Sequence, residues 1–185
     1  MRALGVLALA MWTAPAWASP PGPVQRTEAL LTALQAEDGR EVVLTRFVDR
    51  ESMVNAVVEP LRPRLTTQQY QRTRQVFWQL VQVLVCPDLL TGAQWRVLTP
   101  PKSSTEVSVL ARKIHEDWQS ELTFRWQQGG DQWRVVDVAF DGASLVADYR
   151  NQLARILDRE GANALVRKLE QRATEERRKR GGPAP

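Results

Sequence analysis

Apolar and polar residues alternate in four consecutive stretches near the middle of the chain, at residues 95–99, 105–115, 118–127 and 133–140. In the third stretch, Leu122, Phe124 and Trp126 alternate with polar and charged residues. A two-residue period is typical of strands with one buried face. The connections are short, and the glycine-rich residues 128–131 favour a hairpin turn. We therefore expect these stretches to form one antiparallel sheet.

Before this predicted sheet, apolar residues recur at the three- and four-residue spacing of amphipathic helices. We expect helices at residues 25–35, at 50–59, and from 66 or 67 to 85. Asp49 is placed to cap the second helix. Thr66 or Thr67 begins the third, with Gln68 and Gln69 near the positions that a capping box requires. Prolines follow both helices and stop them. Residues 41–47 stay ambiguous, because their valines favour a strand while their neighbours are helical.

After the sheet, Gly142 ends the last strand and Ser144 is placed to cap a helix over residues 145–157. A second helix is expected at 162–172, and the basic residues 173–185 are expected to be disordered because they carry no apolar face. Within the first of these helices, helical spacing joins Leu145, Tyr149, Leu153 and Ile156.

The order of elements predicts an α+β fold. We expect one curved antiparallel sheet of about four strands, wrapped by the N- and C-terminal helices. Such a sheet leaves a concave interior. The aromatic residues either fill this interior as a core or line an apolar cavity, for which tryptophan and phenylalanine are well suited. The tryptophans concerned are Trp78, Trp95, Trp118, Trp126 and Trp133.

The first 18 residues have the features of a secretory signal peptide. Arg2 is followed by a short apolar run and by an Ala-x-Ala cleavage site at residues 16–18. The apolar run falls short of the about 20 residues that span a bilayer. We therefore expect a periplasmic protein whose single mature domain covers residues 19–172. Its lone cysteine, Cys86, forms no internal disulfide and is interpreted as a buried apolar residue.

Groups for chemistry are few. His115 is the one histidine, and it lies where a surface turn is expected, so neither a catalytic triad nor a metal site is indicated. The chain has no phosphate-binding glycine loop and no motif for a cofactor or metal. Asp137 and Asp141 could form a carboxylate pair, but Asp137 is better interpreted as a hydrogen-bonding residue that orders the strand-to-helix turn. The formal net charge of +4 is mild, and nucleic-acid binding is not expected.

The strand, turn and helix of residues 133–153 resemble the MlaC family of periplasmic phospholipid-transport proteins, also called toluene-tolerance auxiliary proteins. The family pattern has a Trp-x-Val strand, an Asp-Val step, Gly-x-Ser-Leu and a Tyr-Arg pair. Leu65, Thr66, Gln69 and Phe77 also match a capped, phenylalanine-bearing helix of the family. The matching positions in residues 133–153 are Trp133, Val135, Asp137, Val138, Gly142, Ser144, Leu145, Tyr149 and Arg150.

The resemblance implies a cone-shaped fold, related to that of nuclear transport factor, with an apolar lipid cavity. It implies a monomeric carrier without cofactor or catalysis. The carrier would shuttle phospholipid between an outer-membrane lipoprotein complex and an inner-membrane ABC transporter. The residues expected to line the cavity are Phe77, Leu80, Val81, Leu84, Trp95, Val97, Leu122, Phe124, Trp126, Val135, Val138, Tyr149 and Leu153.

Three further interpretations stay open. The same fold could serve as a small-molecule enzyme that uses Asp137 and a pocket tyrosine. It could also be a non-catalytic protein that binds another component of the cell envelope. Several arginines either meet a lipid phosphate at the cavity mouth or only solvate the helix surfaces, and these are Arg72, Arg74, Arg150, Arg155 and Arg167.

Overall fold

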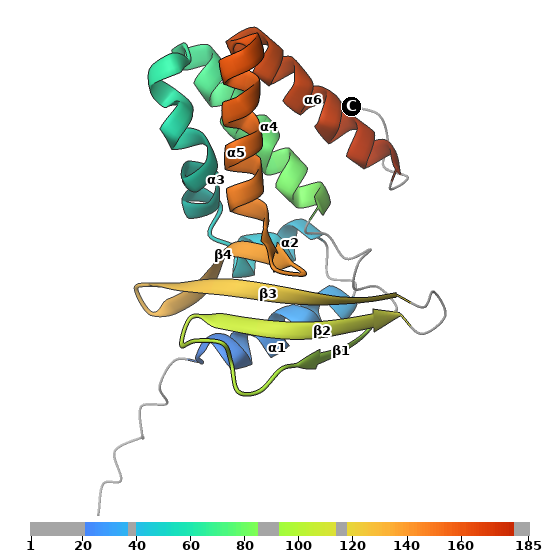
Figure 1. The fold of residues 1–185 in the computed structure, drawn as a ribbon. Helices are drawn as coiled ribbons and strands as arrows, with labels where there is room; N and C mark the ends of the chain where they lie inside the picture. Colours follow the sequence, from blue (N-terminus) through green and yellow to red (C-terminus); the bar gives the residue numbers. More distant parts are fainter. Residues whose placement is uncertain (1–20, 37–39, 85–92, 114–117, 180–185) are drawn as a thin grey trace, which may run out of the picture.

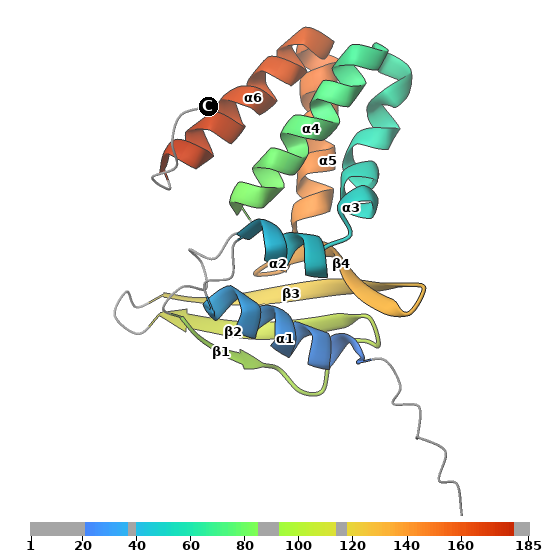
Figure 2. The same cartoon turned by 180° about the vertical axis from the view of Figure 1, so that it is seen from behind.

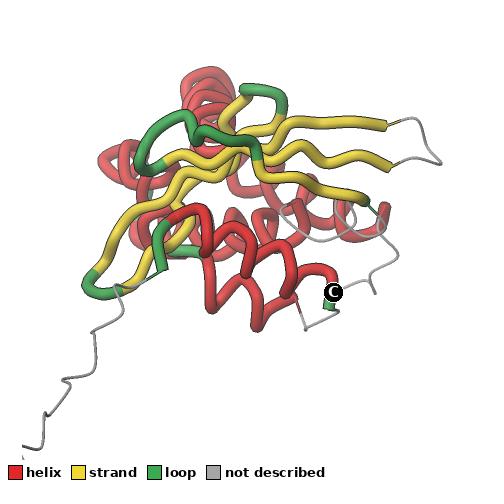
Figure 3. Tube along the Cα trace, turned by 90° about the horizontal axis from the view of Figure 1, so that it is seen from below, coloured by secondary structure: helices red, strands yellow, loops and turns green. Residues whose placement is uncertain are grey.

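The computed structural model describes residues 21–36, 40–84, 93–113 and 118–179. Its five-stranded antiparallel sheet has the strands in chain order. Figure 3 shows the strands curving past the helices. The predicted α+β fold with a curved antiparallel sheet is therefore confirmed. The strands are β1 (Gln94–Val97), β2 (Glu106–Lys113), β3 (Trp118–Gly129), β4 (Gln132–Phe140) and β5 (Ala143–Ser144).

The sheet has one strand more than the sequence predicts. Asp141 and Gly142 both adopt positive φ, at 48° and 86°, and so turn the chain back sharply after β4. This turn lets Ala143 and Ser144 pair with Phe140 and Ala139. A two-residue strand is too short to show alternation, which is why the pattern did not reveal it.

Two N-terminal helices, α1 (Pro23–Gln35) and α2 (Arg40–Phe47), lie across one face of the sheet (Figure 2). The indole N–H of Trp126 on β3 donates a buried hydrogen bond of 3.0 Å to the Thr27 hydroxyl on α1. The ambiguous segment 41–47 is helical because Val43, Leu44 and Phe47 then fall on one side and are all buried.

The other helices form a second layer at the β4 side of the sheet (Figure 1). As predicted, Asp49 caps α3, where it accepts a hydrogen bond of 2.9 Å from the Ser52 amide. The capping box of α4 is also confirmed, since Thr66 and Gln69 exchange bonds of 2.9 and 3.2 Å. The elements of this layer are α3 (Arg50–Val58), the 3-10 turn η1 (Glu59–Arg64), α4 (Thr67–Leu84), α5 (Leu145–Glu160) and α6 (Ala162–Lys179).

The expectation of disorder from residue 173 onward is wrong for residues 173–179, which continue α6. Leu169 and Ala173 extend the apolar side of the helix. Glu176 follows on the same side and is only 7% exposed. It is neutralised by Arg172 at 3.0 Å and Lys179 at 3.2 Å. These ion pairs stabilise the last turns of α6, whose polar composition had predicted disorder.

Several sequence interpretations fall outside the described residues. They concern the signal peptide at residues 1–18, Cys86, His115 and the tail after residue 179. None of the helices within the described ranges is long and apolar enough to cross a membrane.

Candidate functional site

The apolar side of α4 lies inside the second layer of helices. Phe77, Leu80 and Val81 are fully buried at 0% exposure. Leu84, one turn after Leu80, is only partly buried at the end of the helix. The helix packs against α6, α3 and α2. This predicted set therefore forms one continuous side that becomes accessible toward Leu84.

The predicted residues of the sheet lie on its apolar face. In the strand register, Phe124 lies between Val107 and Val138, and Trp126 lies beside Val135. Leu122 pairs with Val109 on the same side. All of these side chains are buried at 3% exposure or less. On β1, the predicted residues Trp95 and Val97 are partly buried and pack against the same core.

Tyr149 on α5 lies at the outer edge of the buried α4 side chains. Its ring contacts that of Phe77, with the ring centroids 5.6 Å apart at 58°. Burial raises the pKa of the Tyr149 phenol, while the neighbouring Arg172 guanidinium lowers it by a smaller amount. Tyr149 is thus a half-buried amphipathic side chain at the boundary between core and solvent.

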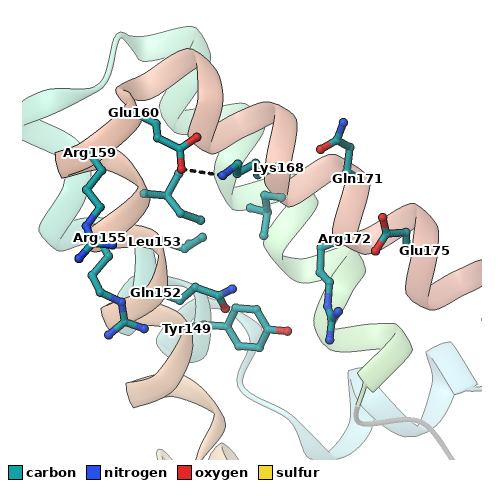
Figure 4. Close-up of a pocket in the computed structure, with 12 residues that line it drawn as sticks. Tyr149, Gln152, Leu153, Arg155, Arg159, Glu160, Lys168, Gln171, Arg172 and Glu175 are labelled. Atoms are coloured by element: carbon teal, nitrogen blue, oxygen red, sulfur yellow. Dashed lines mark hydrogen bonds and ion pairs between the residues drawn. The ribbon is translucent and has the colours of Figure 1, made fainter.

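A hollow of about 600 Å³ lies between α5 and α6, with Tyr149 and Leu153 in its lining (Figure 4). Of the thirteen residues predicted to line a cavity, these two border the hollow. Its apolar lining comes from Leu153, Ile156 and Leu169, and charged side chains surround them. Arg155, which the sequence offered as a phosphate ligand at the cavity mouth, also lines the hollow. The lining residues that the sequence did not indicate are Gln152, Arg159, Glu160, Lys168, Gln171, Arg172 and Glu175.

Most of those residues were missed because no sequence pattern indicates how α5 and α6 are oriented toward each other. The available signal was the helical spacing of Leu165 and Leu169 on α6. That spacing identifies the inner side of α6, and hence the residues at its edge. Whether the α4 set and the sheet set face a common lipid cavity stays a prediction.

The arginines considered for a lipid phosphate separate into two groups. Arg72 pairs with Glu170 at 2.6 Å, and Arg74 pairs with Glu51 at 2.5 Å, so both join elements of the fold. Arg155 lies in the lining of the hollow between α5 and α6. Arg150 lines a different hollow on the polar side of the sheet, and Arg167 is exposed on α6.

Asp137 has the ordering role that the sequence indicated. Its carboxylate accepts a hydrogen bond of 2.6 Å from the Ser144 hydroxyl and one of 3.1 Å from the Val146 amide. Ser144 in turn caps α5 by accepting from the Ala147 amide at 3.0 Å. Asp137 is also paired with Arg125 at 3.4 Å and is only 5% exposed. The carboxylate therefore joins β4 to the start of α5.

The carboxylate pair considered for catalysis does not form a shared site. Asp141 is bonded elsewhere, to the Glu121 amide at 2.8 Å and the Ser120 hydroxyl at 3.1 Å. Both aspartates are thus engaged in holding strands and turns. Within the described ranges, histidine, cysteine and acidic residues form no group of three that could hold a metal ion.

Comparison with known proteins agrees with this arrangement. Residues 32–171 match the family model described as MlaC protein. The fold is similar to that of a phospholipid-binding protein from Ralstonia solanacearum, solved in complex with a phospholipid. The TM-score is 0.60 at 17% identity, and the similarity covers 83% of this chain and 95% of that one. No curated protein matches the chain. Because the family match includes most of the chain, from α1 to α6, this protein belongs to the MlaC family.

Proposed function

We propose that this protein is a periplasmic carrier that binds phospholipid. It would move the lipid between an outer-membrane lipoprotein complex and an inner-membrane ABC transporter. The observation that carries the proposal is the match of residues 32–171 to the MlaC family. The similar fold of a protein solved with a phospholipid supports it.

The physical basis is the apolar interior to which α4, the sheet and α5 all contribute. Burying an acyl chain contributes about 0.8 kcal/mol per methylene, so one chain contributes on the order of ten kcal/mol. The proposed lining is the set of thirteen apolar and aromatic residues from α4, the sheet and α5. Catalysis is not part of the proposal, because Asp137 and Asp141 hold structural hydrogen bonds.

We expect protein purified from the periplasm to carry phospholipid. Lipid extraction followed by mass spectrometry should recover it in a defined ratio to protein. After transfer between donor and acceptor vesicles, the lipid should be chemically unchanged, and His115→Ala should leave transfer intact. Hydrolysed lipid whose production stops in His115→Ala would identify an enzyme instead. Protein without lipid that also fails to transfer it would exclude the carrier.

The proposed compartment has its own test. Cleavage after Ala18 should give a mature protein that begins at Ser19. Mass analysis of intact protein from the periplasmic fraction measures this directly. A chain that retains Met1 and fractionates with the membrane would contradict the assignment of residues 1–18 as a cleaved signal.

A further inference from the structure

The hollow between α5 and α6 combines two kinds of surface. Leu153 on α5 and Leu169 on α6 are buried, at 1% and 3% exposure, and Ile156 is half-buried in the same lining. Polar and charged side chains form the rest of the lining (Figure 4). The accessible surface of the hollow is therefore mostly polar, with apolar contact from the half-buried Ile156 and Tyr149, which suits the head-group end of an amphiphile.

The charges of this lining are unequal. Four cations, Arg155, Arg159, Lys168 and Arg172, accompany two acids, Glu160 and Glu175.

Two of these cations are already neutralised. Lys168 pairs with Glu160 at 2.6 Å, and Arg172 pairs with Glu176 at 3.0 Å. In the part of the chain that the structure describes, no side chain forms a hydrogen bond or ion pair with Arg155 or Arg159. The excess positive charge therefore belongs to these two arginines on α5.

Arg155 and Arg159 are one helical turn apart, so their side chains are neighbours on one side of α5. Two like charges at this spacing repel and weaken a helix slightly. An anion bound between them removes this repulsion. Guanidinium groups match the oxygens of a phosphate in geometry and form charge-assisted hydrogen bonds with them. Glu175, the acid without a cation partner among the described residues, lies on α6 beyond Arg172, away from both arginines (Figure 4).

We infer that the α5–α6 hollow is the mouth of the lipid site and that Arg155 and Arg159 bind the phosphate of the phospholipid. The inference rests on the proposed function and adds a head-group site to it. Acyl chains would enter beside the half-buried Ile156. They would continue past Tyr149, whose ring contacts Phe77 of the α4 set. The same site would select amphiphiles with a phosphate over neutral ones with the same chains.

The test compares lipids that differ only in the head group. Mature protein freed of copurified lipid is titrated calorimetrically with dioctanoyl phosphatidylglycerol and with dioctanoylglycerol, which has no phosphate. The double variant Arg155→Gln/Arg159→Gln should bind phosphatidylglycerol about tenfold more weakly, since it loses charge-assisted hydrogen bonds that are partly screened by solvent. Its affinity for dioctanoylglycerol should not change.

The matched control Arg167→Gln/Arg178→Gln removes two exposed arginines of α6 that do not line the hollow. It should bind both lipids as the wild type does.

Four results would overturn the inference. Wild-type protein that binds lipid, together with an unchanged phosphatidylglycerol affinity in the Arg155/Arg159 variant, would show that the phosphate binds elsewhere and would leave the carrier function standing. An equal loss for both lipids would show that the arginines act through the fold. Competition by inorganic phosphate as strong as that by phosphatidylglycerol would show a site for free anions. Wild-type protein that binds neither lipid would exclude the carrier function itself.

Discussion

Asp137→Ala should lower the free energy of unfolding by about 3 kcal/mol, because the carboxylate satisfies two groups that would otherwise be left without their partner. The Val146 amide is buried and donates to Asp137 at 3.1 Å. The Ser144 hydroxyl donates to it at 2.6 Å while capping α5. Removing the carboxylate therefore disturbs the helix cap as well as the junction with β4. Chemical denaturation monitored by circular dichroism measures the loss.

Asp148→Ala is the matched control, since Asp148 is an exposed acid in the first turn of the same helix. It should cost well under about 1 kcal/mol, the contribution typical of a charge near a helix terminus. Asp137→Asn should destabilise the protein as well, because an amide presents one oxygen where the carboxylate presents two. Lipid transfer per folded molecule should change little in all three variants. Equal stability of Asp137→Ala and Asp148→Ala would contradict the role given to Asp137.

Local signals in the sequence predicted many of the element boundaries. The start of α4 was predictable because Thr66 and Gln69 satisfy each other's backbone groups whatever the rest of the fold does. The buried side of β3 followed from alternation, as the pairing of Phe124 with Val107 and Val138 shows. These features depend on neighbours within a few residues or on a strict two-residue period.

Features that depend on tertiary packing were not predictable in the same way. Residues 41–47 contain the same valines whether they form a strand or a helix, and burial of Val43, Leu44 and Phe47 decides for the helix. The last turns of α6 are polar in composition, but Glu176 is held by two cations of its own helix. The hollow between α5 and α6 depends on how two helices are oriented. For that reason Arg159 and Leu169 entered the candidate site only with the structure.

Leu84→Glu should yield folded protein whose lipid content falls by more than about tenfold. A charge placed where an acyl chain lies costs several kcal/mol, and each 1.4 kcal/mol is about a factor of ten in affinity. Leu84 is the accessible end of the α4 set and only partly buried, so a glutamate there can reach solvent when no lipid is bound. Lipid per protein, measured by mass spectrometry after purification, gives the result. A thermal unfolding curve shows whether the variant is folded.

The position three residues earlier should respond differently. Val81 is 0% exposed, so Val81→Glu leaves a carboxylate with no route to water and should destabilise the fold by several kcal/mol. Lipid loss in Val81→Glu would therefore accompany unfolding, whereas lipid loss in Leu84→Glu would not. The contrast between the two variants separates damage to the lipid site from damage to the core.

The matched control for Leu84→Glu is Leu110→Glu. Leu110 is a half-buried leucine on β2, but its register with Glu121 places it on the polar side of the sheet, away from the predicted lipid site. The new carboxylate would meet only mild cross-strand repulsion from Glu121, worth well under about 1 kcal/mol. We expect Leu110→Glu to keep its lipid. If Leu84→Glu is folded and also keeps its lipid, the acyl chains do not lie against the end of α4. The predicted lining from α4 would then belong to the core alone.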